Sequence, residues 1–457
     1  MTAPESLRSP VVLPLVALAL VAVACGGDPG AGPANSAVAD TGNYVVERSE
    51  ADGVETVRTV SGSRWGGNPR LIEELSIGEE VGDDALLFGA ISASWATGDR
   101  IYAVDTQIPA VRAFDHQGNF LHQVGGLGQG PGEYSRPIGL AVDGQGRVLV
   151  TDLQGARLNI YDSDGNRIED WPLGTPQAAL GLQVSLDGEV FTRVIELPSE
   201  ISGPIELKEG MRRVGPDGHQ GDPFYPPEIE FEQPTVKVEF GDNSFDMAIL
   251  PFTPSYQWAF APGGEMIAGV GNEYRIEIHA GGGTVRVIEK AWIPVPVNPD
   301  ERSFRAEMAA QPMRRMAPEL TIPESDVPAH KPAFTRLTAD RNGRLWVTRQ
   351  GPSEIDPDCR ETSGAAGGGV AIVMGASGDT MVRADPGGDD EEYDGDCWRN
   401  TWLFDVFEID SGEFLGTVAA PEPGFTQVQF VDDDVVLGSV TDELGTVRLK
   451  KYRLVID

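Results

Sequence analysis

The chain has 457 residues, of which 35 are Lys or Arg and 71 are Asp or Glu, so its formal charge is −36 at pH 7. A surface this acidic repels the phosphates of nucleic acids and anionic lipid headgroups, which excludes both as general partners and favours simple solubility. The 56 Gly and 34 Pro residues, together with β-branched apolar runs, suit an all-β protein rich in turns.

The first 24 residues have the pattern of an export signal. Arg8 precedes an apolar run over residues 11–24, which is too short to span a bilayer as a helix. The run ends in small residues before Cys25, and this ending resembles a bacterial lipobox, in which the Cys becomes the lipidated first residue of the mature protein. A lipobox usually has a large apolar residue three positions before the Cys, where this chain has Ala22, and Glu5 weakens the basic region. Ordinary signal-peptide cleavage nearby is therefore the alternative. We expect lipidation at Cys25 and attachment to a membrane through that lipid.

Residues 28–42 are rich in Gly, Pro, Ala and Ser, a composition that is typical of a flexible tether. We expect residues 1–24 to form the signal peptide, residues 25–43 to act as the tether and residues 44–457 to fold. A disordered N-terminus without a role predicts the same composition.

A glycine-rich stretch over residues 125–166 predicts the architecture of the folded part. Three apolar runs, at residues 138–142, 148–151 and 158–161, indicate strands separated by turns that contain Asp-Gly. The stretch repeats another with a spacing of 47 residues, and the matching pairs are Ile91 and Ile138, Asp105 and Asp152, Asp115 and Asp162, and Gly118 and Gly165. A period in the forties built of short strands predicts propeller blades of about four strands each.

The same stretch carries a family resemblance. GPGEY at residues 130–134, followed by RPIGLAVD at residues 136–143, resembles an NHL repeat. NHL repeats build six-bladed β-propellers, and the whole chain resembles the bacterial six-bladed propeller lipoproteins. The resemblance implies an all-β, six-bladed β-propeller.

Two segments that lie far apart in the sequence are expected to close the ring. Residues 428–431, 435–440 and 447–455 give three strands of a last blade without a fourth, and residues 71–77 form a strand candidate before the first full repeat. We therefore pair residues 71–77 with the last blade, because closing the ring protects the edges of its sheets. An edge strand of the first blade is the alternative.

Copies of the same signals predict the remaining blades. The third blade spans residues 180–225, the fourth follows from Val236 and includes a hairpin over residues 258–270, and the fifth opens at Ala333.

Two additions interrupt this series of blades. Residues 298–316 predict a helix between blades four and five, which begins with an Asn-Pro-Asp cap and is either a cover over the channel or surface decoration. Residues 351–400 predict a long insertion within blade five, with strands over residues 371–374 and 380–383.

The insertion contains the clearest local signal, Cys359 and Cys397. In a chain that we expect to be exported, oxidation is favoured, so we predict a disulfide between them, with two separate thiols as the alternative. The acidic run at residues 389–396 lacks the ligand spacing of an EF-hand, so we interpret it as a solvated loop rather than a calcium site.

The sequence indicates no cofactor and shows no GxSxG, HExxH, P-loop or dinucleotide motif. Some NHL-type propellers, the peptide-amidating lyases, bind zinc through histidines in the channel. Here His116, His219 and His279 fall in or beside turns at unequivalent positions, which argues against that site. The sequence does not exclude a calcium or zinc ion bound in the channel.

One face of the ring is the candidate binding face. In a propeller, the loops that enter the first strand and follow the second strand open onto the same face, and loops on a rigid scaffold often carry binding residues. The residues at these positions are Asp105, Ser135, Arg136, Asp152, Gln154, Lys331 and Arg349. The three cations among them predict a ligand with a carboxylate, phosphate or acidic side chain, unless each cation pairs with a neighbouring carboxylate.

Together these signals predict a monomeric lipoprotein of the cell envelope, on its periplasmic or outer side. We expect its propeller to act as a binding or scaffolding module for a small molecule, a peptide or a protein. A metal-dependent lyase or lactonase-like hydrolase with its site in the channel is the alternative, and a purely structural envelope protein is a third. Whether the chain is an enzyme stays open.

Overall fold

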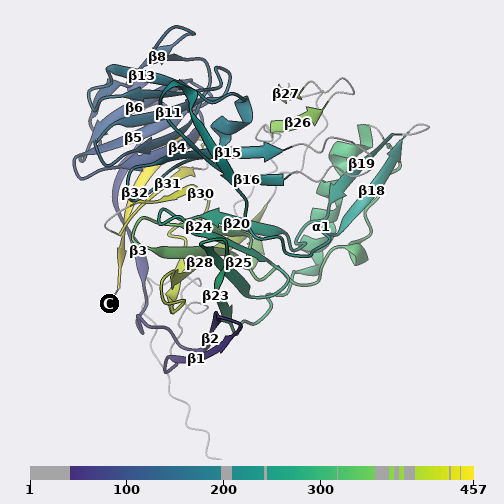
Figure 1. Cartoon of the computed structure of the whole chain (residues 1–457). Helices are drawn as coiled ribbons and strands as arrows, with labels where there is room; N and C mark the ends of the chain where they lie inside the picture. Colours follow the sequence, from purple (N-terminus) through teal and green to yellow (C-terminus); the bar gives the residue numbers. More distant parts are fainter. Residues whose placement is uncertain are drawn as a thin grey trace, which may run out of the picture. The chain divides into compact units, whose positions relative to one another are not determined.

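The computed structural model describes residues 42–196, 208–240, 244–315, 317–355, 370–374, 380–384, 397–431, 434–442 and 444–456 (Figure 1). The predicted signal peptide, Cys25, Cys359 and most of the predicted insertion lie outside these residues. In the described part of the chain, no helix is both long and apolar enough to cross a membrane.

The protein is a six-bladed β-propeller, and within each blade the consecutive strands pair antiparallel. Blade one contains β4 (Ile91–Ala96), β5 (Arg100–Asp105), β6 (Ala110–Asp115) and β7 (Phe120–Gln123). Blade two contains β10 (Pro137–Val142), β11 (Val148–Asp152), β12 (Arg157–Tyr161) and β13 (Arg167–Pro172). Blade three contains β14 (Leu182–Val184), β15 (Val190–Glu196), β16 (Lys208–Val214) and β17 (Gln220–Phe224).

The second half of the ring keeps this order and adds segments to it. Blade four contains β20 (Tyr256–Phe260), β21 (Met266–Val270), β22 (Arg275–Ala280) and β23 (Gly283–Lys290). Blade five contains β24 (Arg336–Ala339), β25 (Arg344–Ile355), β28 (Trp398–Glu408) and β29 (Phe414–Ala419). Blade six contains β30 (Phe425–Phe430), β31 (Val435–Thr441), β32 (Val447–Val455) and β3 (Arg70–Ile77).

The last blade confirms the predicted ring closure. β3 pairs antiparallel with β32, with Leu71 opposite Leu454 and Ile77 opposite Leu449. A strand from near the N-terminus therefore completes the four-stranded sheet at the C-terminus. This pairing covers the edge of β32 and closes the ring.

Buried side chains between neighbouring blades form the core. In the described part of the chain, each of the six neighbouring pairs of blades shares a cluster of buried apolar residues. The cluster between blades six and one joins Ile101 and Ala103 to Leu437 and Leu449. Because a single twisted sheet cannot bury both of its faces alone, this stacking supplies the hydrophobic stabilisation of the ring.

Short turns connect the strands as the sequence predicts. At the turn between β10 and β11, Oδ1 of Asp143 accepts hydrogen bonds from the amides of Gln145 and Arg147, both at 2.9 Å. Gly146 has a φ of 77°, which favours glycine. The glycine-rich loop before blade two adds a short parallel pair, β8 (Gly126–Leu127) and β9 (Glu133–Tyr134).

An N-terminal hairpin extends blade four, which the sequence did not predict. β1 (Val45–Ala51) and β2 (Val54–Ser61) form the hairpin, and β2 pairs parallel with β23, so this sheet has six strands. Asp52 and Gly53 have positive φ in its turn, so the Asp-Gly pair was a readable hairpin signal. The sequence contained no signal for the strand beside which it lies.

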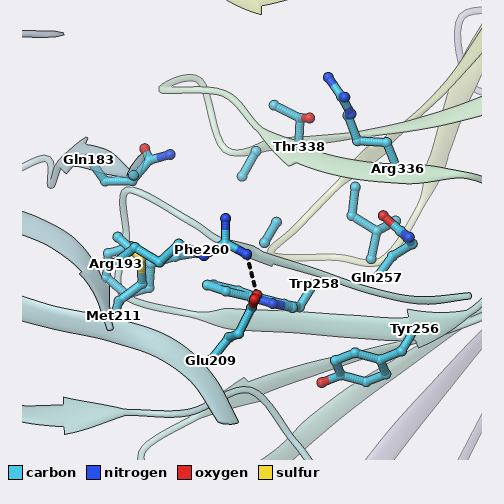
Figure 2. A pocket seen from close by; sticks show the side chains of 14 residues that line it. Gln183, Arg193, Glu209, Met211, Tyr256, Gln257, Trp258, Phe260, Arg336 and Thr338 are labelled. Atoms are coloured by element: carbon cyan, nitrogen blue, oxygen red, sulfur yellow. Dashed lines mark hydrogen bonds and ion pairs between the residues drawn. The ribbon is translucent and has the colours of Figure 1, made fainter. Parts of the chain in front are cut away.

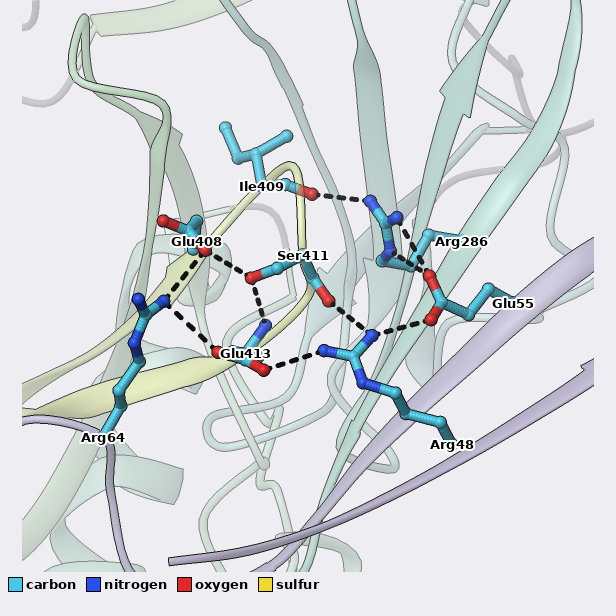
Figure 3. A network of polar contacts seen from close by, with 8 residues as sticks. All are labelled: Arg48, Glu55, Arg64, Arg286, Glu408, Ile409, Ser411 and Glu413. Atoms are coloured by element: carbon cyan, nitrogen blue, oxygen red, sulfur yellow. Dashed lines mark hydrogen bonds and ion pairs between the residues drawn. The ribbon is translucent and has the colours of Figure 1, made fainter.

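Ion pairs fasten this hairpin to the turn between β28 and β29 (Figure 3). Arg48 lies 2.6 Å from Glu55 and 2.9 Å from Glu413, and Arg286 lies 3.0 Å from Glu55. Arg48 and Arg286 lower the pKa of Glu55 through these hydrogen bonds. Because the groups are partly exposed, each pair stabilises only weakly, but together they link the N-terminal segment to blades four and five.

The excursion between the blades contains a hairpin as well as the predicted helix. Helix α1 (Pro299–Ala310) is capped by the side chain of Asn298, and a 3₁₀ turn, Gln311–Arg315, follows it. The hairpin of β18 (Thr235–Phe240) and β19 (Ser244–Ile249) packs against this helix through Val238 (Figure 1). The prediction that blade four follows from Val236 is therefore wrong, because this hairpin buries its apolar residues against the helix and blade four begins at β20.

The insertion in blade five lies between β25 and β28, so it is shorter at both ends than the predicted residues 351–400. Its described residues are two paired strands, β26 (Val370–Met374) and β27 (Thr380–Ala384). Cys397 immediately precedes β28, whereas Cys359 lies outside the described residues, so the disulfide stays a prediction.

Candidate functional site

The two predicted aspartates end the second strands of blades one and two, and both are fully buried. Asp105 accepts hydrogen bonds from the amides of Gly89 and Ala90, at 2.8 and 3.1 Å. Asp152 accepts them from the amides of Ser135 and Arg136, at 3.2 and 2.8 Å. Each carboxylate therefore fixes the loop that enters its own blade, which explains why the sequence repeats it.

An arginine on the third strand accompanies each of these carboxylates. Arg112 lies 3.3 Å from Asp105, and Arg157 lies 3.4 Å from Asp152. Since loop amides and an arginine surround each carboxylate, Asp105 and Asp152 each hold the entering loop on their own blade and are not open to a ligand.

Arg349 lies at the same place in blade five but carries the opposite charge. Its Nε lies 2.8 Å from the carboxylate of Asp405 on the third strand, and Asp405 is fully buried. Asp405 also accepts hydrogen bonds from Tyr274 and Thr417, and Lys290 lies 3.2 Å away. Burial raises the pKa of Asp405, but the charges of Arg349 and Lys290 outweigh this effect and hold that pKa well below its usual value.

Lys331 is buried rather than displayed at the channel mouth, with 1% of its surface exposed. Its ammonium donates hydrogen bonds to the carbonyl of Gly351 at 2.8 Å, to Oδ1 of Asn400 at 2.7 Å and to the hydroxyl of Ser353. The register between β25 and β28 shifts at this place, so Lys331 binds a carbonyl in an interrupted part of the ladder. Burial lowers the pKa of Lys331 to about 8.

The other two predicted residues belong to blade two. Gln154 is exposed on the loop after β11. Arg136 is half-buried, and its guanidinium has no hydrogen-bond or ion-pair partner among the described residues. The seven candidate residues thus fall into three local groups, in blades one, two and five, and the cations Lys331 and Arg349 already bind partners inside the fold.

A cavity of about 480 Å³ lies elsewhere, against strands of blades three, four and five (Figure 2). The hairpin of β1 and β2 covers the β23 edge of blade four, so β20 is the opposite edge, which faces the central channel. The first strands of the two adjacent blades, β14 and β24, line the same cavity. The cavity therefore opens at the channel edges of these three blades and extends between blades three and four.

The cavity lining mixes polar and apolar side chains. Arg193 of β15 is paired with Glu209 of β16, and Arg336 stands apart from this pair beside Thr338 (Figure 2). The Nε of Arg193 is buried and has no hydrogen-bond partner in the described part of the chain. Gln183 and Gln257 add amide groups, and Trp258 adds an aromatic surface. Polar groups converging in a channel cavity can orient a small ligand by hydrogen bonds.

Sequence reasoning missed these residues, although an alignment of the repeats contains a signal. Arg336 lies seven residues before Gly343, and Gly139 lies seven residues before Gly146. A long cationic side chain thus replaces a glycine at a first-strand position, and this difference between the repeats could have singled out Arg336.

The histidines and acidic residues that the structure describes do not form a metal centre. In the residues that the structure describes, no three His, Cys, Asp or Glu side chains come together as a metal site would require. His279 contacts Glu277 at 3.3 Å and Thr284, and the acidic run at residues 389–396 lies outside the described part.

The fold and the cavity define the class, a six-bladed β-propeller with a cavity that opens at its channel. Residues 81–173, which include blades one and two, match a family described as a 6-bladed beta-propeller (DUF5128). A stretch of 41 residues is 51% identical to Protein lin-41 of Caenorhabditis elegans, and it covers 9% of this chain and 4% of that protein.

Solved structures of other proteins are similar over most of the chain but at low identity. A member of the duf4221 family from Bacteroides vulgatus is 11% identical with a TM-score of 0.47, covering 86% of this chain and 99% of that one. A candidate exported protein from Bacteroides fragilis is 11% identical with a TM-score of 0.42, covering 85% and 95%. Virginiamycin B lyase from Staphylococcus aureus is 10% identical with a TM-score of 0.35, covering 85% and 100%. Similarity at this level carries no argument about ligand or activity.

Proposed function

We propose that the protein is an exported, lipid-anchored binding module that takes a small polar molecule into its channel cavity. The observation that carries this proposal is the cavity of about 480 Å³, whose wall combines charged, amide and aromatic side chains from three blades. Ligand sites in proteins are often concave and carry a few convergent polar groups, and this size is within their usual range.

The binding proposal is tested with a broad library of neutral and charged metabolites against the full-length chain in detergent, by thermal shift and calorimetry. Thr338→Trp places a large side chain in the cavity wall, whereas Gln154→Trp places the same side chain on an exposed loop as a control. Binding that Thr338→Trp abolishes and Gln154→Trp preserves supports the channel site. Binding that both variants retain, with normal melting curves, places the ligand elsewhere and contradicts the proposal.

The anchor has its own test. Cys25→Ser should shift the protein from the membrane fraction to the soluble fraction or leave it unprocessed, because the lipid is lost. Mass spectrometry of wild-type protein without a lipid on Cys25, together with complete solubility, would reject the anchor.

A metal-dependent lyase or lactonase-like hydrolase in the channel stays the alternative. Metal analysis of the purified protein distinguishes it, because a stoichiometric ion in the wild type that is lost on filling the cavity would favour an enzyme.

A further inference from the structure

The charge of the ligand can be argued from Arg336, which is the first residue of β24 and lines the cavity. Its side chain is exposed, and no hydrogen bond or ion pair of its guanidinium occurs among the described residues. In a chain with a formal charge of −36, nearby carboxylates are plentiful, so an arginine without one on a channel wall is unusual.

The charges on the cavity wall do not balance. Glu209 is already paired with Arg193, and no other acidic residue lines the cavity in the part of the chain that the structure describes. Two arginines therefore face one carboxylate, which leaves a local excess of one positive charge. A ligand with a single negative charge would neutralise this excess, whereas a doubly charged phosphate would overcompensate it.

Two other groups in the cavity wall are neutral and can form hydrogen bonds, and one of them, Thr338, lies beside Arg336 (Figure 2). Thr338 and Gln183 line the same cavity, and their side chains make no hydrogen bond within the described residues. A planar guanidinium binds both oxygens of a carboxylate with two parallel hydrogen bonds, and hydroxyl or amide groups beside it can donate further ones.

The opposing interpretation is that Arg336 is an ordinary solvated surface residue. Its place in the cavity wall argues against this, since Arg336 is the cation of that wall that has no carboxylate partner among the described residues. From the unpartnered guanidinium and the charge excess, we infer that the cavity selects a small molecule with one carboxylate, held by Arg336. This inference rests on the proposed channel site.

The experiment compares acids with their neutral amides in the full-length protein. Benzoate against benzamide and indole-3-acetate against indole-3-acetamide keep the shape constant while removing the charge, and inorganic phosphate tests the doubly charged alternative. We expect the acids to bind by calorimetry and Arg336→Gln to weaken them by about tenfold or more, as the loss of a charged hydrogen bond predicts. Arg336→Lys should recover part of the binding.

A matched control uses Arg136→Gln, because Arg136 is another arginine whose guanidinium has no partner among the described residues but which does not line the cavity. This variant should bind the acids as the wild type does. Amides that bind as well as acids, a preference for phosphate, or Arg136→Gln and Arg336→Gln with equal effects would overturn the inference.

The two proposals fail in different ways. If no acid binds at up to about 10 mM, the carboxylate inference is wrong. The channel site itself survives this result if a neutral ligand from the broad library binds and is lost in Thr338→Trp. If the library yields no ligand that this variant blocks, the proposed function fails together with the inference.

Discussion

Blades two and five use the same turn and then differ at the end of the second strand. In blade two, Asp143 accepts hydrogen bonds from the amides of the turn and pairs with Arg147 at 2.7 Å. In blade five, Asp340 makes the same turn bonds and pairs with Arg344 at 2.6 Å. The local sequence therefore produces the same local structure in both blades.

The difference lies six residues after the turn glycine. Blade two carries Asp152 there, with the cation Arg157 on the next strand, while blade five carries Arg349, with the carboxylate Asp405 on the next strand. Strands two and three are adjacent in each sheet, so a pair of opposite charges fits in either orientation. Only the first orientation lets the carboxylate reach the amides of the entering loop, and in blade five Lys331 fixes that loop by binding the carbonyl of Gly351.

The largest effect should come from removing the carboxylate of each pair. Asp405→Asn leaves Arg349 and Lys290 without their shared buried counter-charge, so we expect the free energy of unfolding to fall by about 3–5 kcal/mol. Asp152→Asn should lower it by about 1–3 kcal/mol, because its partner Arg157 is partly exposed and keeps two backbone carbonyls. Urea denaturation measures both values. Equal losses would mean that the two networks are equivalent.

Reversing the charges tests the orientation. The double variant Arg349→Asp with Asp405→Arg should be more stable than the less stable of its single variants, with a coupling energy of about 1 kcal/mol or more. The corresponding reversal in blade two, Asp152→Arg with Arg157→Asp, should recover less, because the amides of Ser135 and Arg136 then lose their acceptor. Recovery of the same size in both blades would show that the entering loop does not need the carboxylate.

The buried Lys331, before the first strand of blade five, should make the free energy of unfolding depend on pH. Its pKa of about 8 in the folded state lies below the ordinary lysine pKa of 10.5, so the unfolded chain binds more protons between these values, and Lys331 makes the protein more stable as the pH rises. From pH 7.5 to 9.5 this contribution should amount to about 2 kcal/mol. The difference in unfolding free energy between the wild type and Lys331→Met should therefore change by this amount across the window. A constant difference would show that Lys331 titrates alike in both states.

The smallest effect should be the same in both blades. Gly146 and Gly343 have φ values of 77° and 74°, and a Cβ at either position would meet no atom within 4 Å. Gly146→Ala and Gly343→Ala should each lower the unfolding free energy by about 1 kcal/mol, from backbone strain alone. Melting curves that separate the two variants clearly would show that the turns are not equivalent.

Much of the fold could be predicted because it rests on local patterns. The spacing of 47 residues, the Asp-Gly turns and the apolar strands fixed the blades, and the missing fourth strand of the last blade predicted the pairing of β3 with β32. The capping residue Asn298 likewise located the start of helix α1. In each case the residues that determine the structure are close in sequence or recur at a fixed period.

The partners of individual side chains were decided by the tertiary structure. Arg349 was correctly aligned with Asp152, but its partner Asp405 is 56 residues further along the chain, beyond the insertion. The hairpin of β18 and β19 carries strand signals as good as those of a blade, yet it packs on α1. The cavity is lined by three blades, so no single repeat contains it, and Arg336 became a candidate only when β14, β20 and β24 were placed around the same space. Periodic patterns determine which strands form, whereas burial and charge pairing between distant segments determine which side chains remain available to a ligand.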